Sequence, residues 1–270
     1  MTFDVTCKST QLRCIGGGVA LLWVLTVPVA NAALNDTGIL QCGDATTYST
    51  ATCASVASDT SQYPRQDAVA GRDYAASLNQ LPKIGGGAKG FDFTKVANNG
   101  NDLAAGAAWG TAPGDWGCVR DNVTGLVWEI KSPNATDLRY KGNTYTWYSS
   151  TAYNGGPVGA SNGGACTQAG RCDTEKFVAD VNTAGLCGAS NYPWRLPTYI
   201  ELQGIMDLGA TNPMIDSTYF SDADPSTYWW TGMLVTSDTT AAWAIGMTDG
   251  AMYRLAQTST YRIRLVRGAQ

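Results

Sequence analysis

The residues best suited to binding chemistry lie in the last third of the chain, where large aromatic side chains stand among aspartates and arginines. Exposed tryptophan and tyrosine rings stack on sugars or anchor protein interfaces. A binding face is therefore expected from Tyr228, Trp229, Trp230, Trp243, Tyr253 and Arg254. The alternative is that most of these rings are buried between strands. Alternation along a strand predicts that Trp229 and Trp230 are not both buried.

Charged residues in the same region offer two further kinds of site. Hard oxygen ligands for calcium could come from Asp222, Asp224 and Asp238. Their spacing matches no complete calcium loop, so solvated loop acids are expected, and calcium is the one cofactor considered. Four arginines could contact an anionic ligand, although pairing with the domain's own acids is the expected role. They are Arg254, Arg262, Arg264 and Arg267.

Catalysis has little support in the sequence. The chain has no His, which excludes a His-based triad and a His-ligated metal site. A zinc site also lacks a C-x-x-C pair. Carboxylates for glycoside hydrolysis are present, but no spacing singles out two of them. A non-catalytic protein is therefore expected.

The N-terminus has the pattern of a secretory signal peptide over residues 1–32. Lys8 and Arg13 form a basic region, residues 19–27 form a short apolar core, and Ala30-Asn31-Ala32 is a cleavage signal. The core is shorter than the ~20 apolar residues of a membrane span. Cleavage should leave an exported protein without a membrane span, in the periplasm, at the cell surface or outside the cell. The net charge of −4 disfavours nucleic acid as a partner.

Six cysteines follow residue 32, and an even number in an exported chain predicts disulfides. Many pairings are possible, and pairs that are close in sequence are favoured. These are Cys42–Cys53 and Cys166–Cys172, which leaves Cys118–Cys187. The last bridge would close the longest loop and constrain the unfolded chain most.

The chain divides into two parts after the leader. Residues 33–110 form a Ser/Thr/Gly-rich segment with one small disulfide loop and one expected strand near Phe91. Residues 111–270 show clearer patterns, including a helix over 173–184 with Asp173 as its cap. A second helix starts at the capping box of Thr198 and Glu201 and ends at Gly209.

Short strands are expected around these helices, and Asp249-Gly250 is typical of a hairpin turn. The strands are expected over 126–130, 144–148, 228–231, 242–247, 251–255 and 261–267. Two helices among many short antiparallel strands predict an α+β domain stapled by disulfides.

Three blocks of residues then resemble a known family. The first block is Trp116 to Glu129 (WGCVRDNVTGLVWE). The second consists of two short runs, Gly185-Leu186-Cys187-Gly188 and Trp194-Arg195-Leu196-Pro197-Thr198. The third is Arg264-Leu265-Val266-Arg267. In this order and spacing they resemble the DUF1566 family, which includes the C-terminal domain of the Legionella collagen-like adhesin.

The resemblance implies a C-type-lectin-like fold, related to the formylglycine-generating enzymes, in which the chain ends pair as strands. It also implies an adhesin-like protein that binds glycan or protein ligands at the bacterial cell surface. The alternative is a structural or assembly component of an envelope complex. The formylglycine enzymes use cysteines late in the domain, and this chain has none after Cys187. The oligomeric state stays open.

The motif residues have expected structural roles. A turn is expected at Asp121, Asn122, Thr124 and Gly125, because such side chains bond turn backbone and glycine accepts positive φ. Core packing is expected for Trp128, Trp194 and Leu196, with Pro197 before the second helix. Arg195 is expected to pair with Glu201.

Overall fold

A computed structural model describes residues 35–43, 66–152, 156–188 and 190–268. The predicted signal peptide and Cys53 lie outside these residues. Within them, no helix is both long and apolar enough to cross a membrane.

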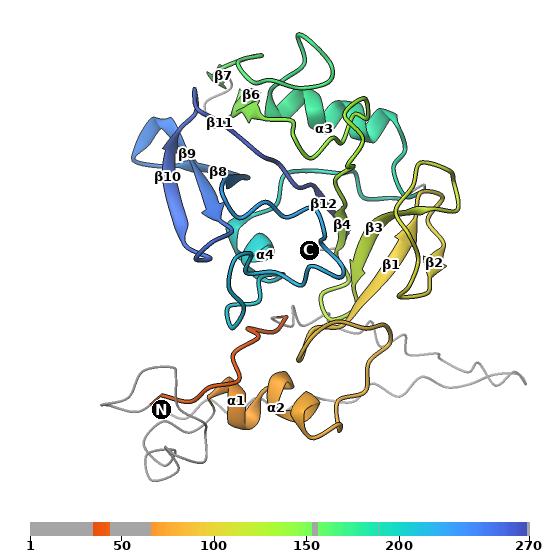
Figure 1. The fold of residues 1–270 in the computed structure, drawn as a ribbon. Coiled ribbons are helices and arrows are strands. Elements are labelled where there is room, and N and C mark those ends of the chain that lie inside the picture. The colour runs from red at the N-terminus through yellow and green to blue at the C-terminus, as the bar shows by residue number, and fades with distance from the viewer. Residues whose placement is uncertain (1–34, 44–65, 153–155, 189, 269–270) are drawn as a thin grey trace, which may run out of the picture. The chain divides into compact units, whose positions relative to one another are not determined.

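The larger sheet has five antiparallel strands in the order β12-β4-β3-β1-β2 (Figure 1). They are β1 (Phe93–Ala97), β2 (Asp102–Leu103), β3 (Trp116–Asp121), β4 (Val127–Glu129) and β12 (Val266–Arg267). The last strand therefore returns to pair with an early one. Strand β1 pairs with β3 along its whole length, so the sheet crosses the predicted boundary at residue 111.

The second sheet has three strands in the order β10-β9-β8. They are β8 (Tyr228–Val235), β9 (Asp238–Gly246) and β10 (Met252–Ala256). The predicted hairpin turn is confirmed, and Gly250 takes a φ of 67° there. Two smaller ladders join β5 (Tyr145–Thr146) to β11 (Thr260–Tyr261) and β6 (Tyr148–Ala152) to β7 (Gly156–Gly159).

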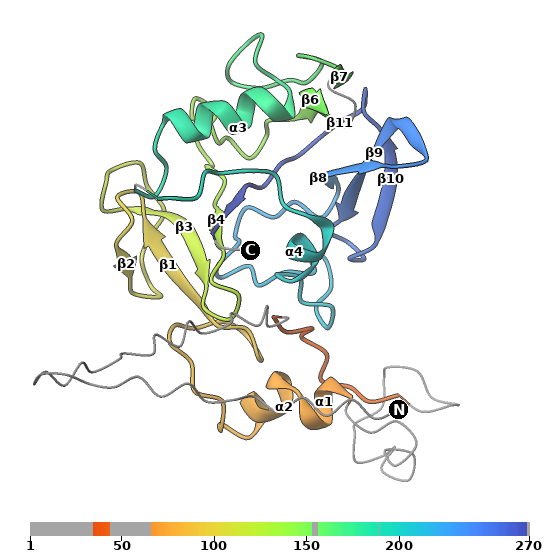
Figure 2. The ribbon, with the colours of Figure 1, turned by 180° about the vertical axis from the view of Figure 1, so that it is seen from behind.

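Both helices predicted from the capping pattern are present. Helix α3 (Thr174–Thr183) begins after Asp173, whose side chain accepts a hydrogen bond from the Lys176 amide at 2.9 Å. Helix α4 (Tyr199–Gln203) begins with a complete capping box. It ends earlier than predicted, because Gly204 is its C-cap and Met206 then bridges to Ile215. Helix α3 lies along β6, and α4 lies against β8 and β9 (Figure 2).

Two short helices in the first segment were not predicted. They are α1 (Asp67–Ala70) and α2 (Arg72–Ser77), which are too short to show a helical period in the sequence. Contacts outside the helices hold them, such as the bond at 2.9 Å from Arg72 Nε to the carbonyl of Gly90.

The core consists of two clusters of buried side chains. The first includes Phe93, Trp128 and Trp229, and the second includes Tyr145, Trp194 and Trp230. Strand β8 supplies a tryptophan to each cluster, so both of its faces are covered at that point. Trp229 and Trp230, which were predicted to form part of a binding face, therefore belong to the core.

A buried ionic network lies beneath the larger sheet. Arg264 pairs with Asp222 at 3.0 Å, and Lys131 pairs with Glu129 at 2.7 Å. The two pairs are linked, because the Lys131 amide donates to Asp222 and Arg264 donates to the Glu129 carbonyl. Burial lowers the pKa of Lys131 to about 8, although Glu129 opposes this shift.

Two of the predicted disulfides are present. Cys118 in β3 bonds to Cys187 beyond α3, and Cys166 bonds to Cys172. Cys42 is buried and disulfide-bonded, and Cys53, its predicted partner, lies outside the described residues.

Removing the long-range bridge should destabilise the protein measurably. A Cys118→Ala/Cys187→Ala variant is expected to lose about 2–4 kcal/mol of unfolding free energy in chemical denaturation, because its bridge spans 69 residues. The matched control is Cys166→Ala/Cys172→Ala, whose bridge spans 6 residues and constrains the unfolded chain less. An equal or larger loss in the control would contradict this explanation.

Candidate functional site

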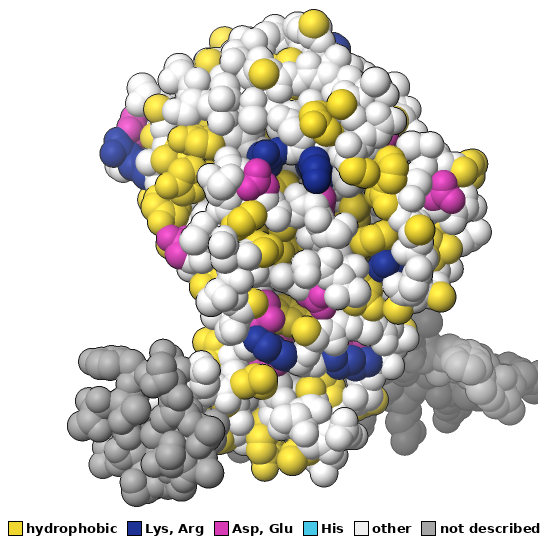
Figure 3. Space-filling model, viewed as in Figure 1, with side chains coloured by type: hydrophobic (Ala, Val, Ile, Leu, Met, Phe, Trp, Pro, Cys, Tyr) yellow, Lys and Arg dark blue, Asp and Glu magenta, His cyan; other side chains and the backbone are white. Residues whose placement is uncertain are grey.

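Three tyrosines form a partly exposed cluster, two of them on the three-stranded sheet and one on β11. Tyr228 of β8, Tyr253 of β10 and Tyr261 of β11 are each half-buried. The ring of Tyr228 lies 4.7 Å from that of Tyr253 and 5.2 Å from that of Tyr261, centroid to centroid. We refer to these three residues as the tyrosine cluster. Figure 3 shows hydrophobic side chains gathered over this part of the surface.

The register of the sheet explains why the rings meet. Tyr228 stands opposite Gly246 of β9, which leaves space where another residue would carry a side chain. A Cβ on Gly246 would lie 3.1 Å from the Tyr253 ring and 3.6 Å from the Tyr228 ring. The glycine therefore lets two tyrosines, one from each strand that flanks β9, pack over it.

Acidic and basic groups surround the tyrosine cluster. The Tyr253 hydroxyl donates to Asp249, and this bond lowers the pKa of Asp249 and raises that of Tyr253. Arg262 pairs with Asp224 at 2.7 Å. Such a surface combines aromatic faces with fixed donors and acceptors, which suits a polar ligand with an apolar side, such as a sugar.

The prediction that Trp229 and Trp230 are not both buried is wrong, because both are 0% exposed. The alternation rule holds, since the two indoles point to opposite faces of β8. Each face, however, meets one of the two core clusters. These two residues therefore form core, and ligand contact through their rings has no structural basis.

The other predicted binding residues remain accessible. Trp243 is half-buried and stands opposite the exposed Arg254 in the β9–β10 register. Arg254 forms an ion pair with Asp238. Tyr228 and Tyr253 belong to the tyrosine cluster.

The structure does not bring the predicted calcium ligands together. Each of the three acids has an arginine partner, with Asp222 on Arg264, Asp224 on Arg262 and Asp238 on Arg254. The expected pairing of arginines with acids is thereby confirmed for three of the four. Arg267 differs, because it donates to the carbonyls of Cys187 and Gly188 and packs over the Trp194 ring.

The turn and core motifs have the expected roles. The Asp121 carboxylate accepts bonds from the Val123 amide and the Thr124 hydroxyl, and Gly125 has a φ of 75°. Asn122 instead donates to Asp92 and Thr94, across to β1. Trp128 and Trp194 are buried, whereas Leu196 is only partly buried and packs against the second core cluster. The Pro197 carbonyl accepts from Gly232 at 2.8 Å, which ties the motif to β8.

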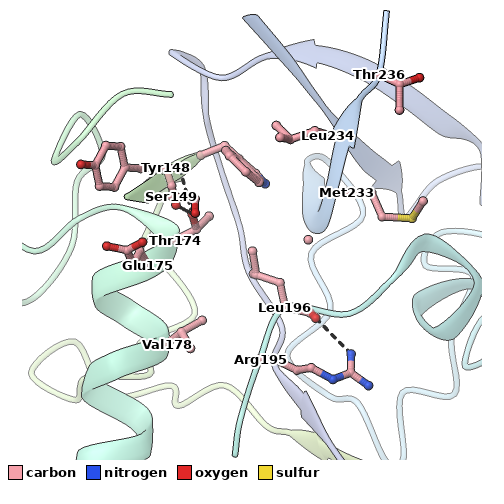
Figure 4. Close-up of a pocket in the computed structure, with 12 residues that line it drawn as sticks. Tyr148, Ser149, Thr174, Glu175, Val178, Arg195, Leu196, Met233, Leu234 and Thr236 are labelled. Atoms are coloured by element: carbon pink, nitrogen blue, oxygen red, sulfur yellow. Dashed lines mark hydrogen bonds between the residues drawn. The ribbon is translucent and has the colours of Figure 1, made fainter. Parts of the chain in front are cut away.

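Sequence reasoning missed a groove between α3 and the far end of β8. It has a volume of about 530 Å³, within the range of ligand pockets. Figure 4 shows Val178, Leu196, Met233 and Leu234 around it, with Arg195 and Glu175 nearer its ends. Arg195 bonds Glu201 through two contacts of 2.9 and 2.6 Å, as predicted, and Glu175 bonds Ser150. The groove is mainly apolar, with the aromatic residues Trp147 and Tyr148 also in its lining. No local pattern could reveal it, because α3 and β8 are distant in sequence.

The fold and bridges define a class of protein: an α+β domain of short antiparallel strands stapled by disulfides, as is typical of exported proteins. Residues 117–267 match the family described as the Lcl C-terminal domain, which is equivalent to DUF1566. The match covers more than half of the chain, so the protein belongs to this family. No curated protein and no solved structure matches the chain significantly.

Proposed function

We propose that this protein is an exported, non-catalytic binding protein, and that the tyrosine cluster contacts a glycan ligand at the bacterial cell surface. The observation that carries the proposal is the half-exposed tyrosine cluster, in which Tyr253 and Tyr261 both contact Tyr228, beside the Arg262–Asp224 pair. Membership of a family associated with an adhesin supports the same conclusion.

A C-type-lectin-like arrangement is part of this proposal. The pairing of β12 with β4 and the presence of α3 and α4 between small sheets support it. In such an arrangement the tyrosine cluster lies in the late part of the domain, where the resemblance implies a binding face.

A glycan-array screen of the purified protein tests the proposal, followed by titration of the best ligand. Tyr253→Ala should weaken binding about 10-fold or more, because an aromatic anchor at the centre of an interface typically contributes that much. Tyr253→Phe should bind nearly as well as the parent, since it keeps the ring and loses only the bond to Asp249.

The control is Tyr192→Ala, which removes an exposed tyrosine outside the cluster and should leave binding unchanged. All variants must first show the parent's thermal unfolding. The proposal fails if no glycan binds at high protein concentration, or if Tyr192→Ala weakens binding as much as Tyr253→Ala.

The groove favours a second function, as a structural or assembly component of an envelope complex. A mainly apolar lining suits an apolar side chain of a partner protein. Leu234→Asp should then disrupt assembly and leave glycan binding intact. Tyr253→Ala therefore tests the glycan-binding function, and Leu234→Asp tests the assembly function.

A further inference from the structure

Three carboxylates meet in the segment that precedes the family domain. Asp36 lies in the stretch 35–43, Asp67 is the first residue of α1, and Asp73 lies in α2. Each offers one oxygen, and these three atoms lie within 4.8 Å of one another. We call these residues the three-aspartate cluster.

Two of the three acids are buried, and none of the three has an ion-pair partner among the described residues. Asp73 is 0% exposed and Asp36 is 7% exposed. Among the described residues, no lysine or arginine forms an ion pair with any of the three. Two other buried acids, Asp222 and Glu129, are neutralised by Arg264 and Lys131. Buried Asp92 and Asp121 also lack ion pairs, but both of their oxygens accept hydrogen bonds.

Two oxygens in the cluster have no hydrogen-bond donor. They are Oδ2 of Asp36 and Oδ2 of Asp73, for which the described part of the chain supplies no partner. The remaining bonds hold the carboxylates in position. The Gly90 amide donates to Asp73 Oδ1 at 2.8 Å, and the Thr37 hydroxyl donates to Asp67. A buried anionic oxygen without a donor or cation is strongly unfavourable.

Two glycines make room for these carboxylates. A Cβ on Gly90 would lie 2.1 Å from Asp36 Oδ2, and one on Gly71 would lie 1.5 Å from Asp67 Oδ1. The backbone therefore approaches the acids more closely than any other residue would allow. This close approach brings acids from three separate stretches of chain to one point.

We propose that the three-aspartate cluster binds a calcium ion. The ligands are oxygens alone, which favours calcium or magnesium over transition metals that prefer nitrogen and sulfur. Calcium tolerates an irregular shell completed by carbonyls and water, whereas magnesium requires a near-ideal octahedron. The ion would connect the stretch 35–43 to both short helices, and so fasten the first segment of the chain.

A proton is the competing way to relieve the repulsion. Burial raises the pKa of Asp36 from 3.8 to about 8, and the neighbouring carboxyl groups of Asp73 and Asp67 raise it further. Two nearby cations make hydrogen bonds to backbone carbonyls, although the charge of Lys83 still acts on Asp36. Arg72 donates Nε to the Gly90 carbonyl, and Lys83 donates to the carbonyls of Gly87 and Lys89.

The sign of the pH effect follows from that shift. The pKa of Asp36 is higher in the folded state than in the unfolded state, so the protonated form stabilises the fold. This stabilisation is complete below pH 4 and is lost as the pH rises through 8. Calcium should therefore stabilise the protein most at or above pH 8, where the proton has left.

Thermal unfolding of the purified protein at pH 8.5 tests the site, after removal of metals with a chelator. Addition of millimolar CaCl₂ is expected to raise Tm by about 5 °C or more, and calorimetry should detect one site. MgCl₂ should have a smaller effect. Asp36→Asn and Asp67→Asn should each reduce the calcium-dependent shift to less than half.

The control is Asp102→Asn, which removes an exposed acid paired with Arg120 and should keep the full shift. Asp67 is only partly buried, so its variant serves if Asp36→Asn fails to fold. The proposal is overturned if calcium leaves Tm unchanged at pH 8.5 while Tm falls between pH 4 and 8, which indicates a shared proton. A calcium shift that persists in both cluster variants would overturn it as well.

Discussion

Replacing Asp222 with alanine is expected to lower the free energy of unfolding by about 3–5 kcal/mol. Asp222 and Arg264 have side chains that are 4% and 0% exposed, so the variant leaves a guanidinium buried without its carboxylate. The Lys131 amide also loses its acceptor. Urea denaturation followed by tryptophan fluorescence measures the loss.

A double variant separates the pairing from the packing. Asp222→Ala/Arg264→Met removes both charges, and it should be more stable than Asp222→Ala alone. Asp102→Ala is the exposed control, since the side chains of Asp102 and its partner Arg120 are 57% and 34% exposed, and it should cost less than about 1 kcal/mol. If the two single variants lose similar amounts of unfolding free energy, burial of the Asp222–Arg264 pair does not increase its contribution to stability.

Replacing Trp229 with alanine should destabilise the protein by about 3–5 kcal/mol, because it leaves a large cavity in the first core cluster. The ring also lies 4.9 Å from the Arg264 guanidinium, so the ionic network loses a neighbour. Chemical denaturation should show this loss, and any reduction in ligand binding should follow the fraction of unfolded protein.

Phenylalanine variants give matched controls for the two tryptophans. The Trp229 indole nitrogen has no hydrogen-bond partner among the described residues, so Trp229→Phe loses packing alone. The Trp230 nitrogen donates to the Tyr145 carbonyl at 2.8 Å, so Trp230→Phe also leaves a buried acceptor unpaired. Trp230→Phe should therefore be the less stable of the two. The reverse order would contradict the assigned bonds.

The sequence predicted the helices and turns that depend on contacts between residues close together in the chain. The Asp173 cap and the Thr198–Glu201 capping box located α3 and α4, because each cap bonds within three residues of itself. The hairpin at Asp249-Gly250 and the turn at Gly125 depend on backbone preferences of single residues. The pairings Cys118–Cys187 and Cys166–Cys172 were also predicted.

Features that depend on distant contacts were missed for a physical reason. Whether Trp229 is buried depends on what covers each face of β8, and that cover comes from residues far away in sequence. The groove likewise needs α3 and β8 to meet. Arginines were expected to pair with acids, but the sequence did not predict which acid each would contact, since Asp222 and Arg264 are 42 positions apart. Alternation predicts which face a side chain takes, but it cannot predict that both faces are covered.

Because β1 pairs with β3, the folded sheet includes residues that lie before the region matched by the family. The family match starts at residue 117, whereas β1 spans Phe93–Ala97 and supplies Phe93 to the core. A fragment cut at the family boundary would expose the backbone of β3 along an apolar strand. Such an edge is a template for pairing with another chain and leads to aggregation. Soluble expression of the domain therefore requires the strand that precedes the match.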